Sequence, residues 1–301
     1  MEETLVNGLV RGAIYALIAL GYTMVYGILG IINFAHGEVY MIGMFTGILT
    51  LGVCATVGGL PVGVALAVAF GMAMTISAAY GFTNERIAYR PLRRAHVLAP
   101  LISAIGVSTF LQNFVMNAQS KDKVDFPRVY SRPLVEPTVM ISGVRITALQ
   151  IFIVALSVVL MIGLYLFVQH TRLGKAMRAC SQDKIMAGLI GIPVDRVIVV
   201  TFMIGSALAA AAGMLFAMYN GVAKFDAGYV AGLRAFTAAV LGGIGNIPGA
   251  MLGGFVIGLV EDVTAYKLGP DWKDISAFCA LMIILIFRPR GLLGERVAEK
   301  V

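Results

Sequence analysis

The chain has few charged side chains and few of the residues that build chemical sites. Asp, Glu, Lys and Arg make up 13% of its 301 residues, beside three histidines and three cysteines. A soluble globular domain carries about 25% charge. The cysteines are odd in number and widely spaced, and no His, Cys, Asp or Glu cluster has metal-ligand spacing. A soluble fold, a disulfide framework and a metal centre are therefore not predicted.

Sequence signals for a nucleotide site or a catalytic triad are also missing. Gly174 and Lys175 lack both the upstream glycine spacing and the Ser or Thr of a phosphate-binding loop. The three histidines, His36, His96 and His170, lie near the ends of apolar runs and suggest no Ser-His-Asp set. We therefore predict that the chain is not an enzyme and that it holds no cofactor of its own.

Long apolar runs dominate the sequence. Hydrophobic residues make up 59% of the chain, and many windows of about 20 residues carry no charge, which is the length that crosses a bilayer as a helix. The fold class predicted is an all-α polytopic membrane protein, with residues 1–301 as a single transmembrane domain. The acidic Met-Glu-Glu start favours an uncleaved first span. We expect about seven full transmembrane helices, near residues 5–29, 39–57, 61–81, 97–117, 147–168, 197–219 and 275–287.

Residues 233–260 form an apolar run that is broken in its middle by glycine and proline. Each flank is too short for a comfortable span, so we predict a pair of half-length helices, as a re-entrant hairpin or as two short passes. The residues at the break either line a translocation path or pack helices closely, since Gly245, Gly249 and Gly253 are four apart. The candidate path residues here are Gly242, Gly243, Gly245 and Asn246.

Lysine and arginine placement predicts the orientation. Thirteen of the 23 basic residues lie in three acid-poor segments, 82–96, 171–196 and 288–301. The positive-inside rule assigns these segments to the cytoplasm, which gives an external N-terminus and a cytoplasmic C-terminus. The polar loop 118–146 then lies outside, and residues 139–146 in it are a candidate hairpin.

The most distinctive polar segment is residues 171–196, which lies between two apolar runs. Its basic residues alternate with alanine and methionine, so we predict a short amphipathic helix that is closed by Gly191 and Pro193. Such a helix docks a cytoplasmic partner, binds anionic lipid, or is a solvated loop that fixes topology. We favour docking, and the candidate coupling residues are Lys175, Ala176, Arg178, Ala179, Asp183, Gly188 and Gly191.

A second polar segment follows the first span. Asn33, His36 and Glu38 are predicted to lie near one another at a helix junction, as part of a path or gate. The alternative is a cytoplasmic turn in which Asn33 caps a helix and the other two side chains are solvated. Elsewhere the spans hold almost no ionisable residues, which disfavours a proton- or sodium-coupled carrier.

Four strings carry a family resemblance: YALIALGYTMVYG at 15–27, INFAHGEVYM at 32–41, GKAMRA at 174–179 and LGGIGNIPGA at 241–250. With them, the chain resembles the H-type permease subunit of the bacterial high-affinity branched-chain amino acid (Leu/Ile/Val) ABC transporter. Segment 171–196 then resembles the coupling loop of ABC importers. Their Glu-Ala-Ala signature lacks its Glu here, where Arg178-Ala179-Cys180 stands.

The resemblance implies partners, a place and an energy source. The partners are a homologous second permease subunit, two cytoplasmic ATPase subunits that hold ATP and Mg, and a periplasmic substrate-binding protein. The place is the bacterial inner (cytoplasmic) membrane, which the chain crosses many times. The mechanism is alternating access driven by ATP. The alternatives are a related importer for urea, short amides or other amino acids, and a stand-alone secondary carrier or channel.

Overall fold

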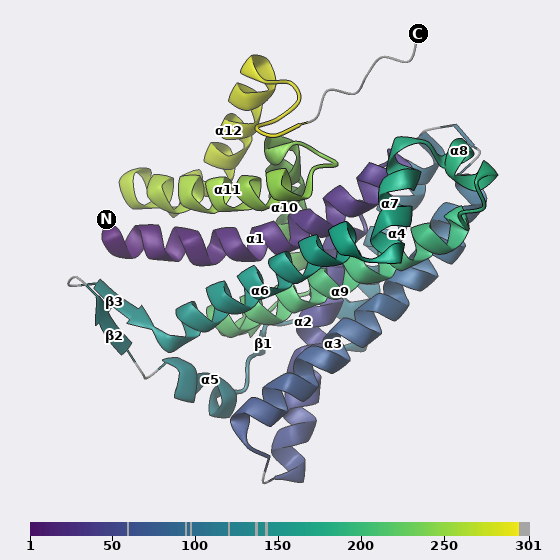
Figure 1. The fold of residues 1–301 in the computed structure, drawn as a ribbon. Coiled ribbons are helices and arrows are strands. Elements are labelled where there is room, and N and C mark those ends of the chain that lie inside the picture. The colour runs from purple at the N-terminus through teal and green to yellow at the C-terminus, as the bar shows by residue number, and fades with distance from the viewer. Residues whose placement is uncertain are drawn as a thin grey trace.

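The computed structural model describes residues 1–58, 60–93, 95–96, 98–119, 121–135, 138–141 and 144–294. Helices form nearly all of this part of the chain (Figure 1). They are α1 (Glu2–Leu29), α2 (His36–Val57), α3 (Val62–Asn84), α4 (Leu98–Ala118), α5 (Arg128–Val135), α6 (Ala148–His170), α7 (Arg172–Gln182), α8 (Lys184–Leu189), α9 (Val194–Asn220), α10 (Ala227–Gly242), α11 (Ile247–Leu268) and α12 (Lys273–Phe287).

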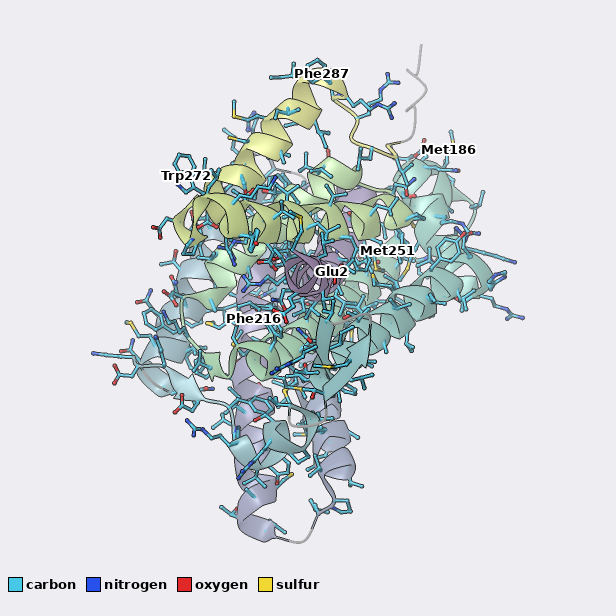
Figure 2. All side chains as sticks on the ribbon, turned by 90° about the vertical axis from the view of Figure 1, so that its left-hand side faces the viewer. Glu2, Met186, Phe216, Met251, Trp272 and Phe287 are labelled. Atoms are coloured by element: carbon cyan, nitrogen blue, oxygen red, sulfur yellow. The ribbon has the colours of Figure 1, made fainter. Side chains whose placement is uncertain are left out.

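Helix α1 lies at the centre of the bundle. In its most apolar window, 89% of the residues are buried. It packs against α11, α9, α10 and α6, and Figure 2, which looks along α1 from Glu2, shows the other helices gathered around it. The helix ends at Gly30, whose φ of 70° is left-handed and whose N–H donates to the Tyr26 carbonyl.

Glycine brings α1 and α11 together. A Cβ on Gly12 would lie 2.7 Å from Phe255 Cα, so only glycine fits at this crossing. In lipid, where burial gives helices no drive to associate, such close backbone contact is a main source of packing energy. Gly8 of α1 and Gly254 and Gly258 of α11 serve the same purpose at this interface.

Seven helices within the described residues are long and apolar enough to cross a membrane. Six of them match the predicted spans from 5–29 to 197–219 within a few residues. The seventh is α11 and not the segment near residues 275–287, where α12 has only 15 residues. A helix of that length is shorter than the roughly 20 residues that a bilayer requires.

The predicted pair of half-length helices fits the structure only in its first member. Helix α10 has 16 residues, but α11 has 22 and runs past residue 260, where the prediction ended. The prediction stopped there because Glu261 and Asp262 are charged. Both carboxylates are buried and ion-paired with residues of other helices, so the helix continues through them.

Short strands lie at one end of the bundle. β2 (Thr138–Ile141) pairs antiparallel with β3 (Val144–Thr147), which confirms the predicted hairpin. β1 (Val124–Asp125) pairs with β4 (Val222–Ala223) and ties the loop after α4 to the end of α9. Parts of three segments of the sequence argument lie outside the described residues: Arg94 of segment 82–96, Ser142 and Gly143 of the candidate hairpin, and residues 295–301 of segment 288–301.

Segment 171–196 contains two short helices, α7 and α8, and not the one that was predicted. Asp183 separates them in an extended conformation, with φ −155° and ψ 110°. Its Oδ1 accepts hydrogen bonds from the amides of Ile185 and Met186, at 2.9 and 3.1 Å. An aspartate that caps the next helix in this way ends the previous one. Gly191, with φ 87°, ends α8 near the predicted position.

Candidate functional site

The chain turns back into the bundle after α1. Asn33 is 3% exposed, and its Oδ1 accepts hydrogen bonds from the Ala35 amide at 3.1 Å and from the Tyr89 hydroxyl at 2.8 Å. Tyr89 lies in the π-helical turn Glu85–Tyr89 that follows α3. Asn33 therefore supports the start of α2 and links it to the end of α3.

His36 and Glu38, in the first turn of α2, are both 1% exposed. The His36 ring lies edge-on to Tyr22, with 4.8 Å between ring centroids, in the space left by Gly21. Glu38 Oε1 accepts from Ser108 Oγ at 3.1 Å. The alternative in which both side chains are solvated is wrong, because α1 and α4 cover them. The three predicted residues share one helix start but bond or pack with three different elements.

The glycine-rich break is a tight turn between α10 and α11. Gly243 and Gly245 have φ of 106° and 96°, a region that strongly favours glycine. Asn246 caps α11, because its Oδ1 accepts from the Gly249 amide at 2.9 Å. A Cβ on Gly242 would meet the Gly249 backbone, so close packing, one of the two predicted roles, explains this glycine.

Helices α7 and α8 form a unit with an inner and an outer side. Met177 and Cys180 of α7 and Ala187 of α8 are buried against the bundle. Burial also raises the pKa of the Cys180 thiol. Four apolar side chains are 61–76% exposed and form an apolar ridge on α8 and the residue that follows it: Ile185, Met186, Leu189 and Ile190. Met186 lies at the edge of the molecule in Figure 2.

The predicted coupling residues divide between these two sides. Arg178 points inward, and Ala176 and Ala179 are half-buried against the core. Lys175, Gly188 and Gly191 are exposed, and Asp183 acts as a helix cap. Ile185, Met186 and Leu189 are among the apolar residues of the predicted amphipathic segment, whereas Ile190, which adjoins them, was not predicted.

Two cations join the α7–α8 unit to the carboxyl ends of spanning helices. Arg178 Nη1 donates to the Val168 carbonyl and to Gln169 Oε1, the latter at 3.0 Å, at the end of α6. Lys184 Nζ donates to the Leu29 carbonyl at 3.1 Å, at the end of α1. A cation at a helix C-terminus is favourable because the carbonyl dipoles point toward it. Burial, aided by the positive charge of Arg93, lowers the pKa of Lys184.

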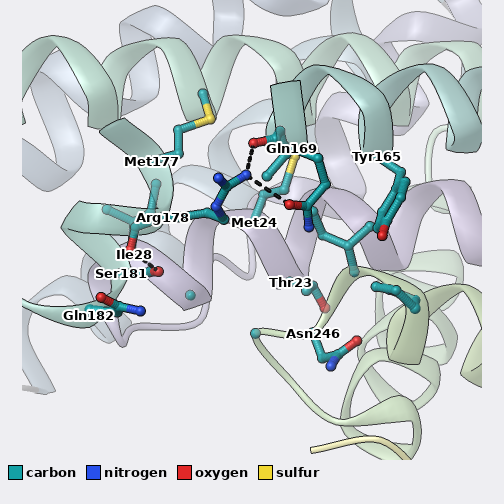
Figure 3. Close-up of a pocket in the computed structure, with 15 residues that line it drawn as sticks. Thr23, Met24, Ile28, Tyr165, Gln169, Met177, Arg178, Ser181, Gln182 and Asn246 are labelled. Carbon is teal, nitrogen blue, oxygen red and sulfur yellow. Dashed lines mark hydrogen bonds between the residues drawn. The ribbon is translucent and has the colours of Figure 1, made fainter. Parts of the chain in front are cut away.

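A cavity of about 340 Å³ lies where these parts meet (Figure 3). Its walls come from the last turns of α1 and α6, from α7, and from the turn between α10 and α11. Two predicted regions, the coupling segment and the glycine-rich break, are therefore neighbours across one cavity. The Asn33–Glu38 junction does not line it. The residues that line it include Thr23, Met24, Gln169, Met177, Arg178, Gly245 and Asn246.

A buried charge network, which sequence reasoning missed, lies in the half of α1 near the N-terminus. Tyr15 donates to Glu261 Oε2 at 2.9 Å and accepts from Arg234 Nη1 at 3.0 Å. Arg234 Nε lies 3.4 Å from Glu261 Oε1 and 2.9 Å from Asp274 Oδ1. The partners of Arg234 in the structure are thus protein groups, consistent with a structural role.

The second half of this network is centred on Asp262. Its carboxylate lies 3.4 Å from Arg11 Nε and 3.1 Å from Lys273 Nζ. The prediction that the spans hold almost no ionisable residues is therefore wrong. The sequence did contain a signal for this network: two adjacent acids in α11, and single arginines in the apolar parts of α1 and α10. In a membrane protein such residues are expected to pair.

Among the carboxylates buried in the described spanning helices, Glu38 alone has no ion pair. Glu85 pairs with Arg93, and Glu261 and Asp262 have the partners given above. Glu38 Oε2 makes no hydrogen bond, and it lies against Gly228 at the start of α10. Glu38 is consequently the one buried acid in these helices that has no basic partner.

Comparison with known proteins identifies relatives that match nearly the whole chain. The chain is 48% identical over 299 residues to the high-affinity branched-chain amino acid transport system permease protein BraD of Pseudomonas aeruginosa, covering 99% of this chain and 97% of the relative. It is 44% identical, with the same coverage, to LivH of Escherichia coli, which has the same description. A probable branched-chain amino acid transport permease protein LivH of Methanocaldococcus jannaschii is 24% identical and covers 97% of this chain.

No solved structure matches the chain significantly. A family model described as "Branched-chain amino acid transport system / permease component" matches residues 4–287, which include every spanning helix, the α7–α8 unit and the cavity. The chain is therefore a multi-pass membrane protein that belongs to the family of branched-chain amino acid transport permease components.

Proposed function

We propose that the chain is the membrane-spanning permease subunit of a binding-protein-dependent ABC importer for leucine, isoleucine and valine. The observation that carries the proposal is the apolar ridge on α8. Its four side chains lie outside the spanning helices and are 61–76% exposed, on a unit tied to α1 and α6. An exposed apolar cluster with a polar rim is typical of a protein-binding surface. The substrate class follows from the relatives at 44–48% identity.

The other subunits belong to the same proposal. Two cytoplasmic ATPase subunits bind ATP and Mg and dock on the ridge. A homologous second permease completes the path, and a periplasmic binding protein delivers the substrate. The chain lies in the bacterial inner membrane and is not itself an enzyme. Substrate passes by alternating access, with Asn33, His36 and Glu38 as gate or path residues on α2.

The orientation has an external N-terminus and a cytoplasmic C-terminus, with α10 as a half-length segment beside the full-length α11. It is supported by the basic residues of segments 82–96 and 171–196. A reporter enzyme that is active only in the periplasm, fused after Asp195, is expected to be inactive. The same reporter fused within the hairpin, after Met140, is expected to be active. The reverse pattern of activity contradicts the orientation.

The α7–α8 unit transmits movement through its two cationic contacts. Lys184 holds the end of α1 and Arg178 the end of α6, so displacement of the unit by an ATPase pulls on both helices. Arg93 connects a further pair of helices, since it bridges Glu85, which follows α3, and Asp195 in the first turn of α9, 2.6 Å from the latter. ATP-driven movement of the unit thereby reaches α1 and α6.

The energy source is tested by leucine uptake in cells that carry the chain with its partners. Uptake is expected to survive a protonophore while ATP is maintained and to fall to background when ATP is depleted. An importer driven by ATP hydrolysis requires no ion gradient. A urea or short-amide importer gives the same energy pattern but with another transported solute, so competition by unlabelled isoleucine and urea identifies the substrate class.

A secondary carrier acting alone is the second candidate, and the observation that favours it is Glu38, a buried acid without a basic partner. An unpaired buried carboxylate is what an ion-coupled carrier uses to bind its ion. Leucine uptake that stops with the protonophore while ATP is held constant would support this candidate. The ridge on α8 would then have no ATPase partner.

A further inference from the structure

We infer that the cavity between α1, α6, α7 and the α10–α11 turn binds the carboxylate and the apolar side chain of an amino acid. The identity of the ligand as an amino acid rests on the proposed function. The binding site itself rests on the charge, the polar groups and the shape of the cavity. Neither the Asn33–Glu38 junction nor the apolar ridge contributes to it.

Charge selects an anionic head group. Arg178 is the one charged residue among the described residues that line the cavity, and no carboxylate faces it there. Its Nη1 is held by the Val168 carbonyl and Gln169, which fixes the plane of the guanidinium (Figure 3). Nε and Nη2 make no hydrogen bond in the described structure. A guanidinium with two such N–H-bearing atoms matches a carboxylate.

A polar group on the α1 wall lacks a partner. Thr23 is 1% exposed, and its Oγ1 makes no hydrogen bond. A buried hydroxyl without a partner is unfavourable, so a ligand that bonds to it gains free energy. Asn246, whose oxygen caps α11, keeps its amide N–H groups for a second contact. Figure 3 shows Thr23 and Asn246 on neighbouring walls of the cavity.

The remaining wall is apolar and suits an aliphatic side chain. Met24, Ile28, Met177 and Ile247 contribute to it. The volume of about 340 Å³ is at the lower end of the range of about 300–1,000 Å³ typical of small-molecule sites. Among the described residues, the cavity lining has no acidic residue to pair with a cationic side chain. Its single basic residue, Arg178, is already assigned to the carboxylate of the ligand, so an acidic side chain would also lack a partner. The cavity therefore favours an amino acid with an uncharged, apolar side chain.

A ligand in this cavity would also affect the movement of the α7–α8 unit. Its walls are the same helix ends that Arg178 and Lys184 connect to the α7–α8 unit. An amino acid bound there contacts both α1 and α7, and it stabilises the arrangement in which the two are close. Released substrate at this site would therefore oppose movement of the unit.

Equilibrium binding of radiolabelled leucine to the whole importer complex tests the site. The complex is held in phosphatidylcholine nanodiscs, without nucleotide and without the binding protein. Thr23→Val keeps the side-chain volume and is expected to weaken leucine binding about 3- to 10-fold, the effect of one hydrogen bond. Thr75→Val, which removes a hydroxyl on α3 away from the cavity, is the matched control and is expected to have no effect. Arg178→Gln is expected to weaken binding at least about tenfold.

Competitors identify the group that the site recognises. 4-Methylpentanoate, which has the carboxylate and side chain of leucine, is expected to displace it, whereas isopentylamine, which has the side chain and amine of leucine but no carboxylate, is not. An unchanged leucine affinity in Thr23→Val overturns the inference, even if Arg178→Gln alters the end of α6. Binding that disappears in phosphatidylglycerol nanodiscs overturns it in favour of a lipid head group. Absence of ATP-dependent leucine uptake by the same wild-type preparation counts instead against the proposed function.

Discussion

Glutamate in place of Met186 or Ile190 is expected to abolish copurification of the ATPase subunits and to lower ATP-dependent leucine uptake about 100-fold. Both side chains belong to the apolar ridge and are 61% and 76% exposed. An apolar interface that must bury a carboxylate loses roughly 3 kcal/mol, which is a factor of about 100 in affinity. Affinity purification followed by quantification of the ATPase subunits measures the first effect, and uptake in cells measures the second.

Met140→Glu is the matched control. Met140 is 66% exposed on the β2–β3 hairpin at the opposite end of the bundle from α8 (Figure 1). This variant is expected to keep its ATPases. Ala179→Glu, a natural choice from the sequence, tests something else, because Ala179 is half-buried against the bundle and a charge there disturbs α7 itself. Normal copurification of both ridge variants would contradict docking at α8.

Glu261→Leu is expected to lower the stability of the bundle by about 1–3 kcal/mol, because the Tyr15 hydroxyl and the Arg234 guanidinium lose a buried acceptor. Glu261 is 0% exposed and is held by both Tyr15 and Arg234. Arg234 keeps its ion pair with Asp274, whose side chain is 57% exposed, so the expected loss is that of a buried acceptor and not that of an isolated buried charge. Thermal unfolding of the purified protein in detergent, followed by circular dichroism, measures the change.

Two further variants separate the loss of charge balance from the loss of packing. Glu2→Leu removes an exposed acid from the end of α1 and is expected to change stability by less than about 0.5 kcal/mol. The combination of Glu261→Leu with Arg234→Leu removes both charges and is expected to regain more than half of the lost stability. If the single variant is as stable as the parent, the contact between Arg234 and Glu261 contributes nothing.

Uninterrupted apolar length made most of the fold predictable. Six spans could be placed because their interiors carry almost no charge, and span length depends only on local sequence. The end of α11 could not be placed, because the groups that neutralise Glu261 and Asp262 lie on α1, α10 and α12. A sequence shows that a residue is charged, but not that a residue more than 200 positions away compensates it.

The candidate site was predictable in its parts but not in its arrangement. Glycine, proline and basic residues marked the α10–α11 turn and segment 171–196, and the structure places both on one cavity. The break at Asp183 depends on side-chain capping, which made one predicted helix into two. The inward direction of Arg178 was not predictable, because it is set by the carbonyl groups at the end of α6.

The central place of α1 has a consequence for biosynthesis. Helix α1 leaves the ribosome well before α9, α10 and α11, which pack around it, and its Tyr15 bonds to a residue 246 positions later. At about 5–20 residues per second, Glu261 is synthesised roughly 12–50 s after Tyr15. For that time Arg11 and Tyr15 lie in or near the membrane without their final partners. Helices that are made late in synthesis therefore complete the enclosure of α1. A chain that stops before α11 leaves α1 exposed to the proteases of membrane quality control.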